Sequence, residues 1–412
     1  MKFCLVTSFF GSHSFGGDAV YADLLCRALL RRGHEVHAAF STRAYEALPD
    51  QLPVRFYEPP PGLKLHDLVS GLAGYLSVFR AHQTGRSPRI RESLRRLFSE
   101  QQFDVIHVHN LSLLGAMDVC SVMRTQSALR LATMHDYWWA CPLSLLWKHD
   151  SRVCERPECF TCCLRAGRPP QFWRRGEWFN ETLGGMDAVL FPSQSAMEIC
   201  QGRGVRHDRT YVLPGMLAEG WRSRTEDPPN AGRRYFAAAG RLVREKGFQT
   251  LIPCMRQLPD VELRIAGAGP AEGYLRRAAR DLPNVRFLGA LDHQEIRRLL
   301  LGARALLVPS LFPETFGLTA AEALSLGVPV IARRRGSLPE LIQATSGGLL
   351  YDEEPQLIEH MRTLAWDDGA RERLSQAAIS ALPGIWLEDE HVKEYLRILA
   401  ECDAARRGGR PA

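Results

Sequence analysis

Apolar residues in the first half of the chain form short runs that alternate with stretches of helical periodicity. Residues 3–7 and 35–40 are runs of strand length, and the apolar positions from Val20 to Leu29 between them recur at helical spacing. Gly33 is suited to end that helix. Further strands are predicted at residues 105–108, 129–133, 188–191 and 211–213. This alternation predicts a mostly parallel sheet with helices on both faces.

The second half of the chain repeats the pattern after a break. Residues 214–232 are rich in Pro, Gly, Asn and charge, which is typical of a linker between domains. Strands are then predicted at residues 235–239, 262–266, 285–288, 305–308 and 328–332, and helices near 248–255, 271–280, 294–301 and 319–326. We therefore expect an α/β protein with two Rossmann-like, doubly wound domains, residues 1–215 and 216–383, facing each other across a cleft.

Composition narrows the functional classes. The 412 residues include 52 Lys and Arg against 46 Asp and Glu, a net charge of +6, which is too small to be typical of a nucleic-acid binder. We expect no nucleic-acid partner. No apolar run approaches the ~20 residues that span a bilayer. Residues 3–10 fit a first strand better than a signal peptide, because a glycine turn and a helical pattern follow them. We expect a cytoplasmic protein.

The first candidate for chemistry follows the strand at residues 235–239. Gly240, Arg241 and Leu242 come directly after it, and Lys246 and Gly247 open the next helix. Two cations beside the free N–H groups of a helix N-terminus are suited to bind a diphosphate. An exposed pair of basic side chains with no ligand is the alternative at this point.

A pair of glutamates follows a later strand. Glu314 and Glu322 lie eight residues apart in the sequence, with a Phe-Gly-Leu turn at residues 316–318 between them. If a helix begins near Gly317, both carboxylates can accept hydrogen bonds from sugar hydroxyls in one cleft. A dinucleotide-binding loop is the rival phosphate site, because Gly267 and Gly269 also follow a strand. Its third glycine should fall at position 272, which is a glutamate.

This combination resembles the family 4 retaining glycosyltransferases of the GT-B fold. The matching segments are residues 240–242 with 246–247, 267–270, the Glu314 to Glu322 pair, and 327–330, together with Gly16-Gly17 and residues 104–109 in the first half. The resemblance covers most of the chain. It implies two domains of the GT-B architecture, with residues 384–412 forming a helix that crosses back to the first domain and a tail.

The resemblance also implies roles for individual residues. Arg241 and Lys246 would neutralise the diphosphate of a nucleotide-sugar donor, Glu314 would contact the sugar, and Glu322 would contact the ribose. The remaining donor-binding residues would be Gly16 and Gly17 at a helix N-terminus, Gly267 and Gly269 beside the nucleotide, Leu288 near the base, and Phe316, Gly317 and Leu318 in the donor loop. Catalysis would require no cofactor, since two cations and a helix N-terminus can stabilise the departing diphosphate.

Three histidines lie at predicted strand ends in the first domain. His135 ends the strand at residues 129–133, and the resemblance places a histidine beside the donor sugar here, so His135 is our catalytic candidate. The alternative is a histidine whose hydrogen bonds are satisfied by Asp136. His107 and His109 lie at the end of another strand and point the same way by alternation, which makes them candidates for the acceptor side.

Five cysteines cluster in a predicted insert, residues 136–180. They are Cys141, Cys154, Cys159, Cys162 and Cys163. In a reducing compartment, clustered thiols favour a metal over disulfides. Structural zinc, an iron–sulfur cluster and thiols without a metal all stay open, because the spacing is irregular. Some relatives carry a similar insert, which suggests a clamp on an acceptor-side loop.

A basic helix is predicted at residues 86–98. The stretch holds five arginines and one glutamate, with Ile90, Leu94, Leu97 and Phe98 at helical spacing. It is either a surface helix docked on the first sheet or a contact for an anionic membrane surface at the inner face of the membrane.

We therefore expect a retaining hexosyltransferase that moves a sugar from a nucleotide-diphosphate donor to a hydroxyl acceptor of unknown identity, in glycan, polysaccharide or glycolipid biosynthesis. The alternative is a non-catalytic binding or regulatory protein of the same fold, with a metal-stabilised insert as its interaction surface.

Overall fold

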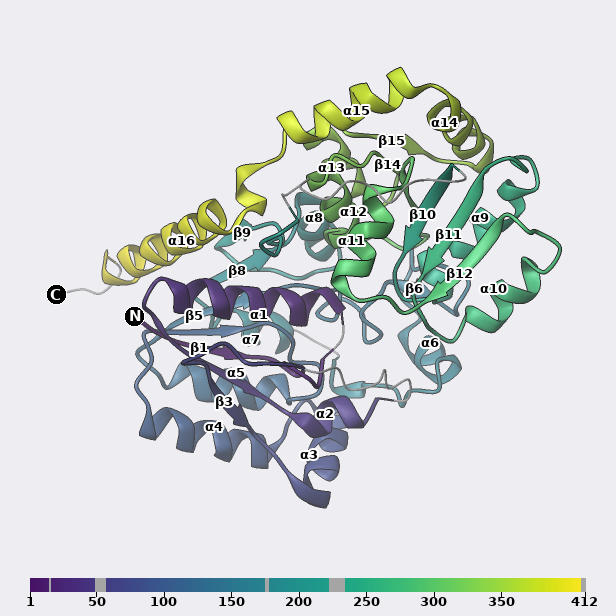
Figure 1. The fold of residues 1–412 in the computed structure, drawn as a ribbon. Coiled ribbons are helices and arrows are strands. Elements are labelled where there is room, and N and C mark those ends of the chain that lie inside the picture. The colour runs from purple at the N-terminus through teal and green to yellow at the C-terminus, as the bar shows by residue number, and fades with distance from the viewer. Residues whose placement is uncertain (15, 49–56, 175–177, 222–233, 409–412) are drawn as a thin grey trace. The chain divides into compact units, whose positions relative to one another are not determined.

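The computed structural model describes residues 1–14, 16–48, 57–174, 178–221 and 234–408 (Figure 1). Residues 222–232 of the predicted linker lie outside this part of the chain. The described chain forms two compact units. Unit 1 contains Met1–Leu145, Pro157–Met216 and the C-terminal segment from Glu388, and unit 2 contains Leu146–Arg156 and Leu217–Leu387. The boundaries predicted from the sequence were 215/216 and 383/384, with the whole insert in the first domain.

Unit 1 is built on a parallel sheet of seven strands in the order β3-β2-β1-β4-β5-β8-β9. The strands are β1 (Lys2–Val6), β2 (Glu35–Phe40), β3 (Lys64–Asp67), β4 (Val105–Val108), β5 (Leu129–Thr133), β8 (Ala188–Phe191) and β9 (Thr210–Val212). The strand order reverses direction between β1 and β4. Such a switch point is where open α/β sheets bind ligands.

The helices of unit 1 connect these strands. They are α1 (Gly16–Arg31), α2 (Thr42–Glu46), α3 (Gly71–Thr84), α4 (Pro88–Glu100), α5 (Ala116–Arg124), α6 (Cys159–Arg165), η1 (Phe172–Arg174), α7 (Trp178–Leu183), α8 (Gln194–Gly202) and α16 (Glu388–Gly408). The predicted basic helix is α4, and its apolar residues Ile90, Leu94, Leu97 and Phe98 are all buried in the unit.

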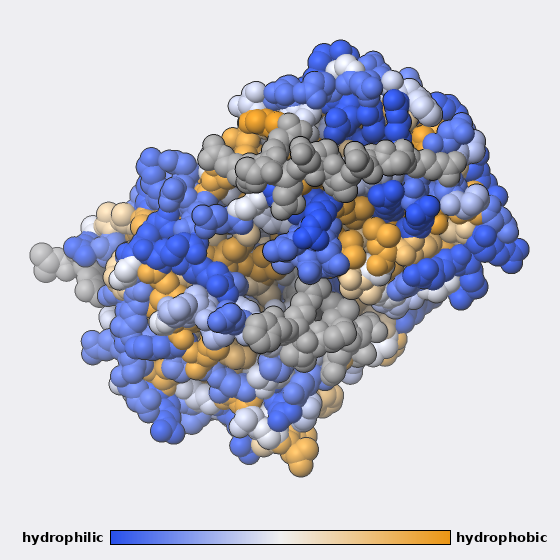
Figure 2. Space-filling model, in the orientation of Figure 1, coloured by the Kyte–Doolittle hydropathy of each residue, from blue (hydrophilic) through white to orange (hydrophobic). Residues whose placement is uncertain are grey.

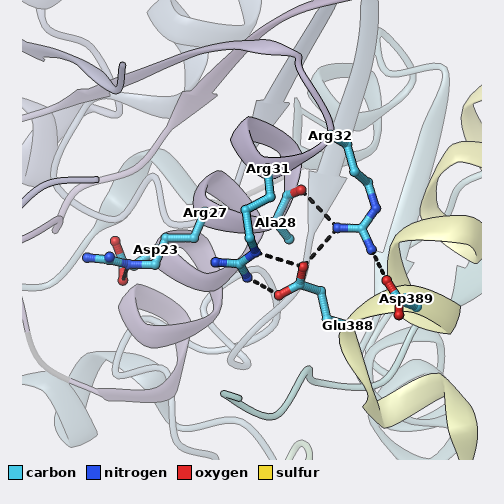
Figure 3. A network of polar contacts seen from close by, with 7 residues as sticks. All are labelled: Asp23, Arg27, Ala28, Arg31, Arg32, Glu388 and Asp389. Carbon is cyan, nitrogen blue, oxygen red and sulfur yellow. Dashed lines mark hydrogen bonds and ion pairs between the residues drawn. The ribbon is translucent and has the colours of Figure 1, made fainter. Parts of the chain in front are cut away.

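Helix α16 returns to unit 1 and packs beside α1. Figure 3 shows the polar contacts at its start: Arg31 Nε donates to Glu388 Oε1 at 3.0 Å, and Arg32 Nη1 donates to the same oxygen at 2.8 Å. Arg32 also pairs with Asp389. Further along, buried residues recur every three or four positions and face the sheet: His391, Tyr395, Ile398, Leu399 and Cys402. The C-terminal helix is therefore a structural part of unit 1.

Unit 2 contains a parallel sheet of six strands in the order β12-β11-β10-β13-β14-β15. The strands are β10 (Tyr235–Ala239), β11 (Glu262–Ala266), β12 (Val285–Gly289), β13 (Leu306–Val308), β14 (Val330–Arg333) and β15 (Gly348–Tyr351). The helices are η2 (Arg244–Lys246), α9 (Phe248–Met255), α10 (Glu272–Ala278), α11 (His293–Leu301), α12 (Leu318–Ser325), α13 (Leu338–Thr345), α14 (Glu354–Trp366), α15 (Asp368–Ser380) and η3 (Gly384–Trp386).

Alternate side chains of the unit 2 strands enter two different cores. Phe236 and Ala238 of β10 pack in a cluster with α9 and α14, whereas Tyr235 and Ala237 pack in a cluster with α11, α12 and α13. Helices therefore cover both faces of the sheet, as the period-two pattern of a doubly wound domain requires. The structure confirms the predicted α/β class with two Rossmann-like domains.

The insert after β5 contains little regular structure. A short antiparallel hairpin, β6 (Trp147–Lys148) with β7 (Arg152–Val153), groups with unit 2, while the segments on either side of it group with unit 1.

Candidate functional site

In unit 2, the loops after β10 and β13 meet at the point where the strand order reverses. The backbone N–H groups of Leu311 and Phe312 donate to Glu245 O at 2.8 and 3.3 Å. Gly247, with φ +76°, lies so close that a Cβ there would be 2.0 Å from Pro309 O. Only glycine fits such an approach. These contacts fix the two loops against each other.

The two loops carry Lys246 and Glu314, which form an ion pair. Lys246 Nζ lies 2.7 Å from Glu314 Oε1, and Ser310 Oγ donates to the same oxygen at 2.5 Å. The Lys246 ammonium also lies over the Phe312 ring, 5.1 Å from its centre. The glutamate side chain is 10% exposed and the lysine side chain 28% exposed. The pair is therefore largely shielded while the cation keeps access to a ligand.

The position of Glu314 is also fixed from a third loop. Ser337 N donates to Glu314 O at 3.0 Å, and a Cβ on Gly336 would lie 2.3 Å from that oxygen. Ser310, Gly336 and Ser337 were not singled out from the sequence. The four-residue spacing of Ser310 and Glu314 is the only local signal, because the contact with Gly336 depends on the fold.

Glu322 lies on α12, which begins directly after Gly317. Its side chain is buried, and burial raises the pKa of the carboxyl group to about 8. Phe316 packs its ring in the core, 5.8 Å from the ring of Trp386. The predicted donor residues Phe316 and Leu318 thus frame a turn, and Gly317, with φ +86°, supplies its left-handed conformation.

Glycines also hold the loops after β10, β11 and β12 together. A Cβ on Gly267, where φ is +138°, would lie 1.9 Å from Gly240 O. Leu242 N donates to Ala268 O at 2.9 Å, and Gly267 N donates to Gly289 O at 2.7 Å.

Four predicted donor-binding residues are distributed over these three loops. Arg241 is exposed on the first loop and lies near the Glu245 carboxylate, Gly267 and Gly269 form the second, and Leu288 is partly exposed at the end of β12. The structure therefore places Arg241, Lys246, Gly267, Gly269 and Glu314 on loops at the carboxyl end of one sheet, whereas Phe316 packs its ring in the core and Glu322 is buried on α12.

In unit 1, the three predicted histidines meet at the carboxyl ends of β4 and β5. His109 Nδ1 lies 2.9 Å from His135 Nε2. His107 lies between Thr133 Oγ1 at 2.8 Å and the Tyr395 hydroxyl at 3.1 Å, and its ring centre is 4.1 Å from that of His109. His107 and His109 are buried and His135 is partly exposed. Burial lowers the pKa of His107 and His135 to about 3, and that of His109 well below its usual value. The cluster is therefore uncharged at neutral pH.

The predicted phosphate-binding glycines lie at the same end of this sheet. Gly16 and Gly17 open α1, and no described atom outside the neighbouring residues lies within 4 Å of a Cβ built on Gly17. Asn110 Nδ2, after β4, donates to Asp18 Oδ2 at 3.1 Å. Asp136, after β5, lies near Asp18, and burial raises the pKa of its carboxyl group to about 7. The N-terminus of α1 is thus held by the hydrogen bond from Asn110, and Asp136 lies nearby as a second acidic group.

The cysteine cluster divides between the two units. Cys154 follows the hairpin of unit 2, whereas Cys141, Cys159, Cys162 and Cys163 belong to unit 1. The pKa of Cys163 is raised to about 11 by burial and by the three neighbouring unit 1 thiols. Among the described residues, no group of three or more His, Cys, Asp or Glu side chains has an arrangement that can hold a metal ion.

A cavity of about 370 Å³ lies beside these cysteines in unit 1. Its walls include aromatic, cationic and amide side chains: Trp139, Phe160, Gln171, Phe172, Arg174 and Arg203. Gln171 is buried, and its Oε1 has no hydrogen-bond partner among the described residues. The cavity therefore offers an aromatic wall and polar groups to a ligand.

Two family profiles match the chain over most of its length. The profile for glycosyltransferase family 4 matches residues 15–216, and the profile for glycosyl transferases group 1 matches residues 221–381. The two matches correspond closely to the main segments of units 1 and 2.

Relatives found by sequence similarity carry glycosyltransferase names. A D-inositol 3-phosphate glycosyltransferase of Xylanimonas cellulosilytica is 28% identical over 90% of this chain and 88% of its own length. A GDP-mannose-dependent mannosyltransferase of Corynebacterium glutamicum that acts on a monoacylated phosphatidylinositol monomannoside is 34% identical, over 34% of this chain and only 40% of its own length. The chain thus spans most of one relative and less than half of the other.

Solved structures share the fold. Sucrose-phosphate synthase from Thermosynechococcus elongatus superposes with a TM-score of 0.69 at 20% identity, covering 99% of this chain and 98% of that one. HepE of Anabaena, solved in complex with UDP-glucose, superposes with a TM-score of 0.69 at 16% identity, covering 99% and 100%.

Proposed function

The chain belongs to the family 4 glycosyltransferases of the GT-B fold, and from this premise we propose how its residues transfer a sugar from a nucleotide-sugar donor to a hydroxyl acceptor. The observation that carries the proposal is the Lys246–Glu314 pair at the switch point of unit 2, 2.7 Å apart and locked by two loops. A cation held beside the carboxyl ends of the strands is suited to a diphosphate.

We assign diphosphate binding to Lys246 and Arg241. Cleavage of the glycosyl–phosphate bond places negative charge on the departing diphosphate, and fixed cations stabilise that charge without a metal. Ser310 and Lys246 both contact the same carboxylate oxygen of Glu314, Oε1. The other carboxylate oxygen is left to accept hydrogen bonds from the donor sugar. Glu322 accepts hydrogen bonds from the ribose.

We assign His135 to the donor sugar as a neutral hydrogen-bonding group. Its neutrality follows from burial, and His109 orients its ring. His107 has both ring nitrogens in hydrogen bonds inside the unit, so we assign it and His109 to the positioning of His135 rather than to direct acceptor contact. A neutral imidazole beside the anomeric carbon adds no charge that would oppose the developing oxocarbenium ion.

Retention is accounted for by attack on the same face of the sugar. The bond between the anomeric carbon and the diphosphate oxygen breaks, the acceptor oxygen forms the new bond, and the acceptor proton moves to the departing diphosphate. No protein nucleophile is required in this scheme.

The acceptor is a compound with a free hydroxyl group. We propose that the insert cavity binds part of it, because sugar rings stack on aromatic faces such as Phe160 and Phe172, and Gln171 Oε1 is available as an acceptor of hydrogen bonds. Phe172→Ala is then expected to raise the KM for the acceptor and leave donor-dependent nucleotide release without acceptor unchanged.

A screen of nucleotide sugars for donor-dependent nucleotide release tests the activity. We expect one donor to be turned over by the wild-type chain and not by Lys246→Ala. Failure with every common donor would favour the alternative, a binding or regulatory protein of the same fold.

Structural zinc at the cysteine cluster remains a proposal, and no catalytic step depends on it. Its support is the proximity of four thiols in unit 1, although the described side chains do not form a metal-binding group. Metal analysis of protein purified without chelator tests it: less than about half an equivalent of zinc or iron would exclude a tetrahedral thiolate site.

We propose that the protein acts in the cytoplasm, with contact to an anionic membrane at the inner face. The arginines at residues 86–98 support this contact by charge alone, because the apolar side of α4 is buried within unit 1.

A further inference from the structure

Helix α3 exposes a stripe of large apolar side chains. Leu72, Leu76 and Phe79 are 85%, 73% and 62% exposed. They lie four and three residues apart, which places them on one face of the helix. The opposite face, with Gly74, Ser77, Val78 and Ala81, is buried in unit 1. Single exposed apolar residues are common, but an aligned stripe of three marks a surface that binds something.

The charge around the stripe identifies the kind of partner. Helix α3 contains no Asp or Glu, and Arg80 follows directly after Phe79. Helix α4 packs against α3 and exposes Arg89 and Arg95, with one exposed carboxylate, Glu92, between them in the sequence. Among the described residues, these three arginines form no ion pair, whereas Arg86 and Arg91 lie 3.6 Å from Asp118 and Arg96 pairs with Glu100. Exposed cations without an ion-pair partner, on the helix that carries the apolar stripe and on the helix packed against it, match an anionic lipid surface.

Figure 2 shows apolar surface at the lower edge of the molecule, where Figure 1 labels α3. None of the described helices is both long enough and apolar enough to cross a bilayer.

We propose that unit 1 docks on an anionic phospholipid surface through α3. Leu72, Leu76 and Phe79 enter the boundary between headgroups and acyl chains, and Arg80, Arg89 and Arg95 contact lipid phosphates. Helix α4 contributes charge only, since its apolar residues are buried. This inference uses no residue of the donor site, so it is independent of the proposed transferase activity.

Co-sedimentation with vesicles tests the proposal on the full chain. We expect wild-type protein to bind vesicles of equimolar phosphatidylcholine and phosphatidylglycerol and to bind pure phosphatidylcholine at least about tenfold more weakly. The double variant Leu76→Ser/Phe79→Ser is expected to lose binding to the anionic vesicles by about tenfold or more. Arg80→Ser/Arg89→Ser/Arg95→Ser is expected to lose the preference for the anionic vesicles and its dependence on salt.

The control is Trp366→Ser, which removes an apolar side chain of similar exposure, 56%, from unit 2 and should bind vesicles like the wild type. All substituted side chains are exposed, and nucleotide release by each variant reports whether the fold and the transferase are intact. The proposal would be overturned if wild-type protein does not bind anionic vesicles, or if the Leu76→Ser/Phe79→Ser variant binds them as strongly as the wild type. If the wild type is instead a dimer that this variant dissociates, the stripe binds a second copy of the chain.

Discussion

The two sheets end in opposite kinds of chemistry. At the switch point of unit 2, a lysine and a glutamate form a shielded ion pair on loops fixed by close glycine contacts. At the corresponding end of unit 1, His109 hydrogen-bonds to His135, the ring of His107 lies against that of His109, and burial keeps every imidazole neutral. One site is organised around a charge, and the other is organised to exclude charge.

This difference suits a reaction in which charge develops unevenly. The diphosphate gains negative charge as it leaves, so it needs the cation of unit 2, while the sugar gains positive character, which a protonated imidazole would oppose and a neutral one does not. We therefore expect substitutions in unit 2 to act through charge, and substitutions in unit 1 to act through orientation and hydrogen bonding.

The largest effect is expected from Lys246→Ala. Loss of the cation should lower kcat/KM by about 10³-fold, because the departing diphosphate loses its main counter-charge. Steady-state nucleotide release measures it. Lys393→Ala removes a lysine from an exposed pair with Glu390 and should leave kcat/KM unchanged. Near-normal turnover by Lys246→Ala would remove the diphosphate assignment.

The same substitution leaves Glu314 without its cation, so a loss of stability must be separated from a loss of function. We expect urea unfolding of Lys246→Ala to show a loss of about 1–3 kcal/mol. Lys246→Arg keeps the charge and should recover stability and a part of the activity. If stability returns fully in a variant without charge, such as Lys246→Met, and activity returns with it, the role of Lys246 is structural.

His135→Ala should have the next largest effect, a decrease in kcat of about 10- to 100-fold from the loss of one oriented hydrogen bond. His109→Leu should lower kcat less, because it only releases the ring of His135. His360→Gln in unit 2 is the control.

Since the pKa of His135 is lowered to about 3, the wild-type rate should show no titration near pH 6.5 from this cluster. An acid limb near that pH that His135→Gln abolishes would contradict the neutral assignment.

The neutral cluster also has a consequence for acid stability. The imidazoles stay unprotonated in the folded chain but bind protons below about pH 6.5 when it unfolds, so the free energy of unfolding should fall as the pH falls from about 6.5 towards 3. His109→Gln should reduce that slope by up to about 1.4 kcal/mol per pH unit. An unchanged slope would mean that His109 is protonated in the folded state.

The sequence predicted the strands and loops that carry the two sites, but not which side chains on those loops contact each other. Strands with central positions, such as β4 and β5, were placed correctly because both faces are buried and the apolar runs are continuous. The edge strands β3 (Lys64–Asp67) and β15 (Gly348–Tyr351) were missed. The residues of β3 are mostly exposed and polar, and those of β15 are only partly buried apart from Tyr351. The contact of Lys246 with Glu314 spans 68 residues and that of His109 with His135 spans 26, and both depend on the order of strands in the sheet. Sequence spacing alone contains no such information.

Helix α4 is a second example of what the sequence alone could not predict. Its amphipathic pattern was predicted correctly from the sequence, but the pattern cannot distinguish an apolar face buried in the protein from one presented to a membrane. In the structure Ile90 and Leu94 are buried, and the exposed stripe lies on α3 instead. Periodicity identifies a face, and only packing identifies what covers it.

A smaller effect concerns proton release at Glu322. Its folded pKa of about 8 lies above the ordinary value of 4.5, so the carboxyl group is protonated at pH 7. Ribose hydroxyls that donate to it favour the ionised form, so donor binding near pH 7 should release up to about one proton. Calorimetry in buffers of different ionisation enthalpy measures this, and Glu322→Gln should release none. Equal proton release by both proteins would remove the ribose assignment.

The same shift affects stability with the opposite sign to that of the histidines. Unfolded Glu322 ionises above pH 4.5 while the folded group stays protonated to about 8, so this group lowers the free energy of unfolding as the pH rises between those values. Glu322→Gln should therefore gain stability relative to the wild type across that range. The loss of stability that the histidine cluster causes at low pH and the loss that Glu322 causes as the pH rises towards 8 are then separable by one substitution in each group.

The smallest effect is expected from Tyr395→Phe on α16. It removes the hydroxyl group 3.1 Å from His107 Nδ1 and leaves that buried nitrogen without a partner, which should cost about 1–2 kcal/mol of unfolding free energy. Tyr211→Phe is the matched control, because its hydroxyl also contacts α16, at Glu401, but on the exposed surface, and it should cost less than about 0.5 kcal/mol. Equal losses from the two variants would mean that α16 stabilises unit 1 by packing alone, and that the neutral cluster does not depend on its hydrogen bond to the C-terminal helix.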